Sequence, residues 1–153
     1  MIGNLTGGTV SVSAGATLTG QGTVAGATTI SGNHAPGSGI GSQSFSNGLT
    51  YNTGSLLQWE LSGNTTAAPG TNFDQVLLTG GNLVVNSGAN AGLSFDGAGS
   101  TVDWNDAFWG SARSWTVLAK SGAGSSTGTF AVSMISLDSL GQSLASARAG
   151  ASF

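Results

Sequence analysis

Few side chains in this sequence have the chemistry for catalysis, and the single histidine is the first to consider. A Ser-His-Asp arrangement needs a histidine base that is oriented by a carboxylate and faces a positioned nucleophile. His34 lies in a stretch rich in glycine and asparagine, and no acidic residue is near it in the sequence. The serines around it reflect the general composition. We therefore expect His34 to be a solvent-exposed turn residue without a catalytic role.

The densest group of potential metal ligands consists of oxygen-bearing side chains in the second half of the chain. Asp103 and Asp106 flank Asn105, and Asp96 precedes them. Calcium takes six to eight oxygen ligands, of which such a group would supply some. The spacing matches neither an EF-hand loop nor the glycine-rich repeat that binds calcium in β-rolls. We expect these residues to cap turns and expect no cofactor, with calcium as the alternative.

Pairs of carboxylates could also serve glycoside hydrolysis, which uses two of them on either side of the scissile bond. The available pairs are Glu60 with Asp74, and Asp103 with Asp106. Glycan-active enzymes usually have a cleft dense in acidic, basic and aromatic residues. This chain has only three basic and six acidic residues. The composition therefore favours a protein that is not an enzyme.

The four tryptophans are the remaining candidates for contact with a ligand, because exposed aromatic rings can stack on sugar rings. Trp59 and Trp115 lie in strand-like patterns, which favours packing in the core. Trp104, Phe108 and Trp109 lie close together in a segment that departs from the composition of the rest of the chain. We predict these three as the residues that contact glycans or another partner.

The composition excludes several classes of partner. Three scattered basic residues cannot neutralise a track of phosphates, so we expect no nucleic-acid partner. A net charge of -3 argues against docking on anionic lipid. We expect no membrane span, because no apolar run approaches the roughly 20 residues that cross a bilayer. The absence of cysteine rules out disulfides and cysteine-ligated metals. A scaffold or a binding module remains.

Regularly spaced apolar residues in a background of glycine, threonine and serine predict the elements that position these side chains. Val12, Leu18, Val24 and Ile30 recur at intervals of six. Each predicted strand is short, with one or two apolar side chains that point inward and a small residue at each bend. One such strand cannot bury its apolar side chains without neighbouring strands. Such repetition is typical of a solenoid, in which the chain stacks on itself. The same spacing also suits a left-handed hexapeptide coil, although that register ends after Pro36.

Three segments interrupt the repeats. Residues 64–72 (N-T-T-A-A-P-G-T-N) are rich in turn residues and predict a loop that leaves the coil. Residues 103–113 predict a non-repetitive aromatic insert with a short helical turn. Near the C-terminus, leucines at helical spacing in residues 137–147 predict a short helix or turn with Ser136 or Asp138 as its N-cap.

The order of several short motifs carries a family resemblance. L-T-G-Q-G-T-V-A-G-A-T-T-I-S-G (residues 18–32) is followed by A-P-G-S-G-I-G (35–41). Then come S-L-L-Q-W-E-L-S-G (55–63), F-D-Q-V-L-L-T-G (73–80) and S-W-T-V-L (114–118). Together they cover most of the chain, which resembles the autotransporter-associated β-strand repeat proteins of Gram-negative bacteria.

The resemblance implies a right-handed parallel β-helix that is exported to the extracellular space or the bacterial cell surface. Passenger-like relatives of the PEP-CTERM type often end in a sorting signal, which this chain does not contain. The family offers no catalytic residues to transfer. We therefore expect residues 1–153 to form a single β-solenoid domain, cut from a longer chain, with a structural or display role.

A stack of this kind has consequences for assembly. At roughly 20 residues for each turn, the chain would make about seven turns. Unpaired strand edges at both ends invite another copy, and little surface charge opposes it. We expect self-association end to end or side by side, into fibres or a matrix. The alternative is an adhesive module that binds surface glycans through exposed aromatic rings.

Overall fold

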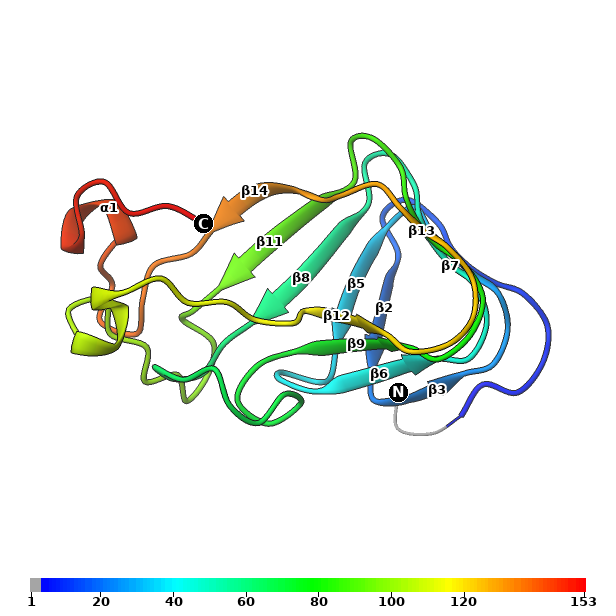
Figure 1. The fold of residues 1–153 in the computed structure, drawn as a ribbon, viewed down its shortest axis with the longest axis horizontal. Coiled ribbons are helices and arrows are strands. Elements are labelled where there is room, and N and C mark those ends of the chain that lie inside the picture. The colour runs from blue at the N-terminus through cyan, green and yellow to red at the C-terminus, as the bar shows by residue number, and fades with distance from the viewer. Residues whose placement is uncertain (1–3) are drawn as a thin grey trace.

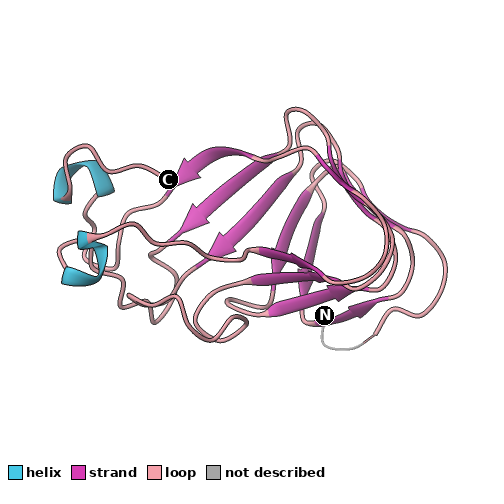
Figure 2. Cartoon of the chain, viewed as in Figure 1, coloured by secondary structure: helices cyan, strands magenta, loops and turns pink. Residues whose placement is uncertain are grey.

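The computed structural model describes residues 4–153 and is all-β, with almost no helix (Figures 1 and 2). The strands are β1 (Val10–Val12), β2 (Thr17–Gly20), β3 (Gly22–Val24), β4 (Thr28–Ile30), β5 (Asn33–Pro36), β6 (Ser42–Phe45), β7 (Leu49–Tyr51), β8 (Leu56–Glu60), β9 (Gln75–Leu78), β10 (Leu83–Val85), β11 (Asn90–Ser94), β12 (Leu118–Lys120), β13 (Ser126–Thr127) and β14 (Ala131–Ile135). The helical elements are the 3-10 helix η1 (Ala107–Gly110) and the α-helix α1 (Leu144–Ala147).

Three sheets contain these strands, and each sheet takes every third strand. Sheet I has the order β1-β4-β7-β10-β13, sheet II the order β2-β5-β8-β11-β14, and sheet III the order β3-β6-β9-β12. Every pairing between these strands is parallel. We call three successive strands, one from each sheet, a tier. Tier 1 is β1–β3, and tier 5 consists of β13 and β14.

The tiers lengthen along the chain because loops are inserted between their strands. Early in the chain, the hydrogen bond from Thr19 to Gly37 joins residues that are 18 positions apart in the sequence. Later, the hydrogen bond from Ser125 to Asn82 joins residues that are 43 positions apart. Most of the added length follows β8 and β11, in residues 61–74 and 95–117. Five tiers therefore account for the described chain, where uniform spacing predicts about seven.

One core receives side chains from all three sheets. Ile30 of β4, Leu57 of β8 and Val76 of β9 are almost fully buried in the same cluster, along with Phe45 and Tyr51. Alternate residues of each short strand point inward, so one or two anchors per strand suffice when the next tier covers them. Burial of these anchors stabilises the stack by roughly 1.5–3 kcal/mol for each large side chain.

Polar side chains also join the tiers. Asn86 Nδ2 donates to Asn52 Oδ1 at 3.1 Å, and Asn52 Nδ2 donates to Ser31 Oγ at 2.9 Å. These three residues follow the sheet I strands of three successive tiers. The ladder satisfies polar groups at the turn, where the backbone leaves one sheet for the next.

A second cluster lies beyond the C-terminal ends of β8 and β11, on the left of Figure 1, and we call it the aromatic lobe. Residues 61–74, 95–117 and 136–153 build it around the following side chains: Trp59, Leu61, Phe73, Phe95, Val102, Trp104 and Leu144. The long insertions thus do not form free loops. They cover a second apolar core that the strands alone would leave exposed.

Two local expectations from the sequence are wrong. His34 is not an exposed turn residue: it lies in β5 and is fully buried, because Gln43 and Tyr51 from neighbouring strands satisfy both ring nitrogens. The C-terminal helix is only one turn long, and its N-cap is Ser143, not Ser136 or Asp138. Gly141 has a φ of 76°, outside the helical region, and this keeps the helix from starting earlier.

Within residues 4–153, no helix is both long enough and apolar enough to cross a membrane.

Candidate functional site

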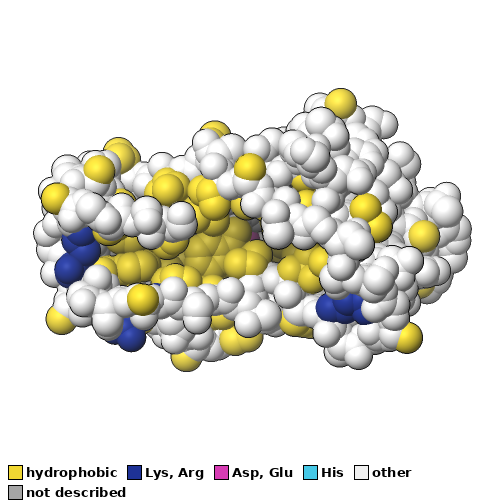
Figure 3. Space-filling view, turned by 45° about the horizontal axis from the view of Figure 1, so that its top comes forward, with side chains coloured by type: hydrophobic (Ala, Val, Ile, Leu, Met, Phe, Trp, Pro, Cys, Tyr) yellow, Lys and Arg dark blue, Asp and Glu magenta, His cyan; other side chains and the backbone are white. Residues whose placement is uncertain are grey.

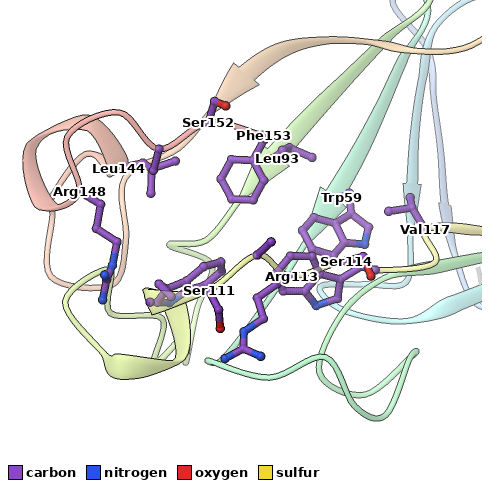
Figure 4. A pocket seen from close by; sticks show the side chains of 15 residues that line it. Trp59, Leu93, Ser111, Arg113, Ser114, Val117, Leu144, Arg148, Ser152 and Phe153 are labelled. Carbon is purple, nitrogen blue, oxygen red and sulfur yellow. The ribbon is translucent and has the colours of Figure 1, made fainter.

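The candidate site is a groove of about 660 Å³ between the aromatic lobe and the last strands. In Figure 3 it is a strip of hydrophobic side chains, with dark-blue basic side chains at the end that belongs to the lobe. Figure 4 shows Trp59 and Leu93 on one side of Phe153, with Arg148 farther into the lobe. The residues used below are Trp59, Leu93, Trp109, Arg113, Trp115, Val117, Arg148 and Phe153.

The loop at residues 64–72 and its flank fix the tryptophan rings of the groove by their indole N–H groups. Trp109 Nε1 donates to Asn64 Oδ1 at 2.7 Å, and Trp115 Nε1 donates to the Thr65 carbonyl at 2.9 Å. Trp59 Nε1 donates to the carbonyl of Asp74 at 2.9 Å. Since these donors are satisfied inside the protein, the rings offer the groove mainly apolar surface.

The three residues predicted from the sequence have different places. Trp104 is fully buried, 4.6 Å from Phe95 and 4.6 Å from Trp109 between ring centroids, so it supports the groove from behind. Phe108 is half-buried and does not line the groove, although it packs edge-on against Trp109 at 4.9 Å. Only Trp109 is both half-buried and part of the groove lining.

Sequence reasoning missed the other aromatic residues of the groove. Trp115 was expected in the core, yet it is half-buried and precedes β12 instead of lying within a strand. Phe153 is 43% exposed and stacks on Phe95 with ring centroids 5.2 Å apart. The signal for Trp115 was its place beside the insert. Phe153 gave none, because its position depends on the return of the chain after α1.

Two arginines line the lobe end of the groove. Arg113 Nε donates to the Phe108 carbonyl at 2.7 Å, and its guanidinium lies 4.3 Å from the centre of that ring. Arg148 donates to the carbonyls of Trp104 and Asp106 at 2.5 and 2.6 Å. The hydrogen bonds found in residues 4–153 give neither guanidinium a carboxylate partner. Their partners are instead backbone carbonyls and, for Arg113, the Phe108 ring.

Asp74, one of the carboxylates considered for hydrolysis, holds backbone amides in place. Asp74 is 1% exposed and accepts hydrogen bonds from the amides of Gly41 at 2.8 Å and Glu60 at 3.0 Å. Burial raises the pKa of Asp74 to about 8, the Gly41 amide offsets part of this rise, and the nearby Glu60 charge adds to it. A substrate has no access to this carboxyl group.

The other candidate pair, Asp103 and Asp106, caps turns. Asp103 and Asp106 accept hydrogen bonds from the amides of Asn105 and Phe108 at 2.8 and 2.7 Å. In the described part of the chain, no three histidine, cysteine, aspartate or glutamate side chains come close enough to hold a metal ion. The calcium alternative at Asp96, Asp103 and Asp106 thus has no ligand cage in this structure.

His34 links neighbouring strands through hydrogen bonds of its side chain. Its Nδ1 lies 2.6 Å from the Tyr51 hydroxyl, and its Nε2 lies 2.8 Å from Gln43 Oε1. Because this Gln43 oxygen can only accept, His34 Nε2 carries the proton and Nδ1 accepts from Tyr51. Burial lowers the pKa of His34 to about 4, and the Gln43 hydrogen bond offsets part of this. The imidazole is neutral at pH 7 and holds β5, β6 and β7 together.

No protein-family model, curated protein or solved structure matches this chain. The resemblance to autotransporter-associated repeats therefore stays a prediction from its motifs. The described residues offer an apolar groove, buried acidic side chains and a neutral histidine.

Proposed function

We propose that this chain is a structural segment of an exported protein and that its three sheets are the faces of a right-handed parallel β-helix. One observation carries the proposal: each sheet takes every third strand, and every pairing between named strands is parallel. Such an order follows when the chain completes one turn for each three strands. The role of the segment is to extend and display, and we propose no catalytic residue in it.

The physical basis of that role is a stiff and nearly uncharged rod. Backbone hydrogen bonds run from tier to tier, and the core anchors stack in columns. Residues 1–59 contain no aspartate, glutamate, lysine or arginine. Most of the exposed residues in the described part of this segment, residues 4–59, are therefore serine, threonine, asparagine and glycine. We place this rod outside the cell or on the bacterial surface, where it associates end to end or laterally into fibres or a matrix.

Nuclear Overhauser effects in the labelled protein test the fold behind this proposal. Thr29 pairs with Ser11 on one side and with Thr50 on the other. We expect Hα-to-amide contacts of parallel strands from Thr29 to both neighbours. Close Hα-to-Hα contacts across either pair, which antiparallel strands give, would overturn the β-helix. Protease shaving of intact source cells tests the location, and a chain protected until lysis would contradict surface display.

A second candidate function is glycan binding in the groove. The specific observation in its favour is the aromatic lining of Trp109, Trp115 and Phe153 beside Arg113, which has no carboxylate partner in the described residues. The apolar rings would stack on sugar faces, and the guanidinium would bind hydroxyl or carboxylate oxygens.

Tryptophan fluorescence with neutral and uronate-containing oligosaccharides tests this second function. We expect binding to shift the emission and to shield the groove from acrylamide. Phe153→Ala removes an exposed ring of the groove and should weaken binding several-fold. Leu140→Ala removes an exposed apolar side chain outside the groove and should leave binding unchanged. An unaltered spectrum at millimolar sugar would exclude this function.

A further inference from the structure

The two ends of the strand stack are complementary in their strand positions. At the N-terminal end, Leu5 forms a parallel bridge with Val24 of β3. Leu5 therefore occupies a sheet III position below tier 1. At the other end, tier 5 has β13 in sheet I and β14 in sheet II, and the described residues add no further strand to sheet III. One end has the strand position that the other lacks.

The incomplete tier 5 leaves an acceptor edge. Sheet III ends at β12, whose outer side pairs with no strand in residues 4–153. Beside it, all five residues of β14 are exposed, including Val132 at 49% and Met134 at 54%. The groove opens at the same end, and Val117, which precedes β12, lines it where the described residues place no tier 5 strand in sheet III. Figure 3 shows this uncovered hydrophobic strip.

The N-terminal end offers a donor edge of the same kind. The Leu5 amide donates to the Thr23 carbonyl at 2.9 Å, and the Leu5 carbonyl accepts from the Ala25 amide at 2.9 Å. Both bonds face β3, and the Leu5 side chain is 40% exposed. Natural sheets protect such edges with charges, proline or bulges. β1, β2 and β3 contain no charged residue and no proline.

We propose that copies of this chain stack head to tail, with the segment around Leu5 of a second copy beside β12 of the first. The same stacking places β1 on β13 and β2 on β14, so each sheet continues from one copy into the next. This inference rests on the proposed β-helix and selects the end-to-end mode of association. The occupant is a second copy, because its Leu5 segment supplies the sheet III position that tier 5 lacks.

The register names the residues that meet. In sheet III, Val24 pairs with Phe45, Phe45 with Leu78, and Leu78 with Lys120. Leu5 stands before Val24 in this column, so Leu5 of a second copy follows Lys120 of the first. The three members between them are fully buried apolar side chains. Lys120 is the one charge in the column, and its Nζ donates to the Gly122 carbonyl at 2.5 Å.

Lys120 therefore disfavours the pairing of a further strand with β12. Its ammonium group must lose water when the next strand covers it, which weakens stacking without forbidding it. Lys120→Leu continues the apolar column and should lower the protein concentration at which oligomers appear about tenfold or more. Leu5→Lys places two ammonium groups together and should abolish oligomers. Leu140→Lys, at a 62% exposed position off the edge, is the matched control and should have no effect.

Cross-linking tests the polarity directly, because the chain contains no cysteine. Within one copy, Leu5 and Lys120 are separated by four strand spacings of about 4.8 Å, roughly 19 Å. In the double variant Leu5→Cys and Lys120→Cys, a thiol cross-linker much shorter than this can join only different copies. We expect a ladder of covalent dimers, trimers and longer species. Either single variant should stay monomeric, because like positions in stacked copies are five strand spacings, about 24 Å, apart.

A double variant that stays monomeric or stops at dimers would overturn head-to-tail stacking. The Thr29 contacts described above are measured on the same samples. If they indicate parallel neighbours while the ladder is absent, the β-helix stands and the stacking proposal fails. If the parallel contacts are absent, the proposed fold and the stacking fail together.

Discussion

His34 and Asp74 are both buried, yet burial shifts their pKa values in opposite directions. Burial disfavours the charged form of each group. The charged form of His34 is the protonated one, so its pKa falls from 6.5 to about 4. The charged form of Asp74 is the deprotonated one, so its pKa rises from 3.8 to about 8. Between about pH 4 and 8, His34 is therefore deprotonated and Asp74 is protonated in the folded state.

These two shifts predict an unusual dependence of stability on pH. Between about pH 4 and 6.5 the unfolded chain gains a proton at His34 and loses one at Asp74 relative to the folded chain, so the two slopes cancel. Above pH 6.5 only Asp74 contributes, and stability falls by up to about 1.4 kcal/mol per pH unit until about pH 8. Urea unfolding at a series of pH values measures this profile.

Single variants separate the two contributions. His34→Gln removes the first, so its stability should fall steadily as pH rises from about 4 to about 8. Asp74→Asn removes the second, and its stability should rise between about pH 4 and 6.5 and then stay level. Both variants will be less stable than the parent at pH 7, so the slopes and not the absolute values are compared. Parallel profiles for the two variants would contradict the assignment.

Asp138 organises the aromatic lobe through backbone amides. Its carboxylate accepts from Gln142 at 2.8 Å, Leu140 at 2.9 Å and Trp104 at 3.0 Å. Burial alone would raise the pKa of Asp138, but these three N–H groups outweigh it and hold the pKa below its ordinary value. The contribution to stability is thus present at neutral pH and is lost as pH falls below that ordinary value.

Replacement of the Asp138 carboxylate should disturb side-chain packing in the aromatic lobe while the strands stay folded. Asp138→Ala leaves buried amides without acceptors, which costs about 1–3 kcal/mol for each unsatisfied group. We expect a loss of near-ultraviolet circular dichroism from the tryptophans, with little change in the far-ultraviolet strand signal. Asp103→Ala, which removes a half-buried cap with one acceptor bond, is the control. Equal effects of the two variants would show that Asp138 has no special role.

At the scale of the elements, the sequence predicts what is local. The spacing of Val12, Val24 and Ile30 predicts short strands with inward anchors, and all three residues are buried. The turn residues at 64–72 predict the loop. His34 was misjudged because its partners, Tyr51 and Gln43, are 17 and 9 residues away and meet it only after the strands stack.

The groove was predicted only in part for the same reason. Trp109 and its neighbours stand out by composition, but composition does not say which ring is covered. Trp104 is buried because Phe95, Trp109 and Phe153 all pack around it. The groove depends on how residues 95–117 and 136–153 fold onto the strand ends. Such contacts between distant insertions have no signal in a short window of sequence.

Close approach between tiers fixes some glycines where the chain passes from strand to strand. A Cβ on Gly122 would lie 1.9 Å from the Thr79 carbonyl oxygen and 2.8 Å from Gly80 Cα, both of which are backbone of the adjacent tier. Gly110 has nothing within 4 Å and no positive φ. Neither glycine has a positive φ, so what separates the two is the space around them and not a need for left-handed backbone.

Alanine substitutions at Gly122 and Gly110 should show whether the free energy of unfolding depends on the space around each glycine. Gly122→Ala forces β9 and the turn after β12 apart and should cost about 1–3 kcal/mol or more, as overpacking does. Gly110→Ala should change the free energy of unfolding by less than about 0.5 kcal/mol. Urea midpoints of the two variants provide the comparison. A Gly122→Ala variant as stable as the parent would mean that the tiers are not in contact there.

On the scale of the whole molecule, a stack of parallel tiers has neighbours only above and below. Stability is then a sum of tier interfaces, and the end tiers have one interface where the middle tiers have two. In sheet II, β8 pairs with both β5 and β11, whereas β14 pairs only with β11. β8 contains the buried Trp59 and Leu57, and all of β14 is exposed.

Amide hydrogen exchange should therefore follow position in the stack. We expect amides of β8 to exchange about a hundredfold or more slowly than those of β14, because opening β8 breaks two interfaces and opening β14 breaks one. At high protein concentration, head-to-tail stacking would give β14 and β1 a second neighbour and slow their exchange, while β8 would change little. Leu5→Lys should keep the gradient and remove its dependence on concentration. Uniform exchange across β8 and β14 would mean that the chain opens as one unit, which a one-dimensional stack with frayed ends does not do.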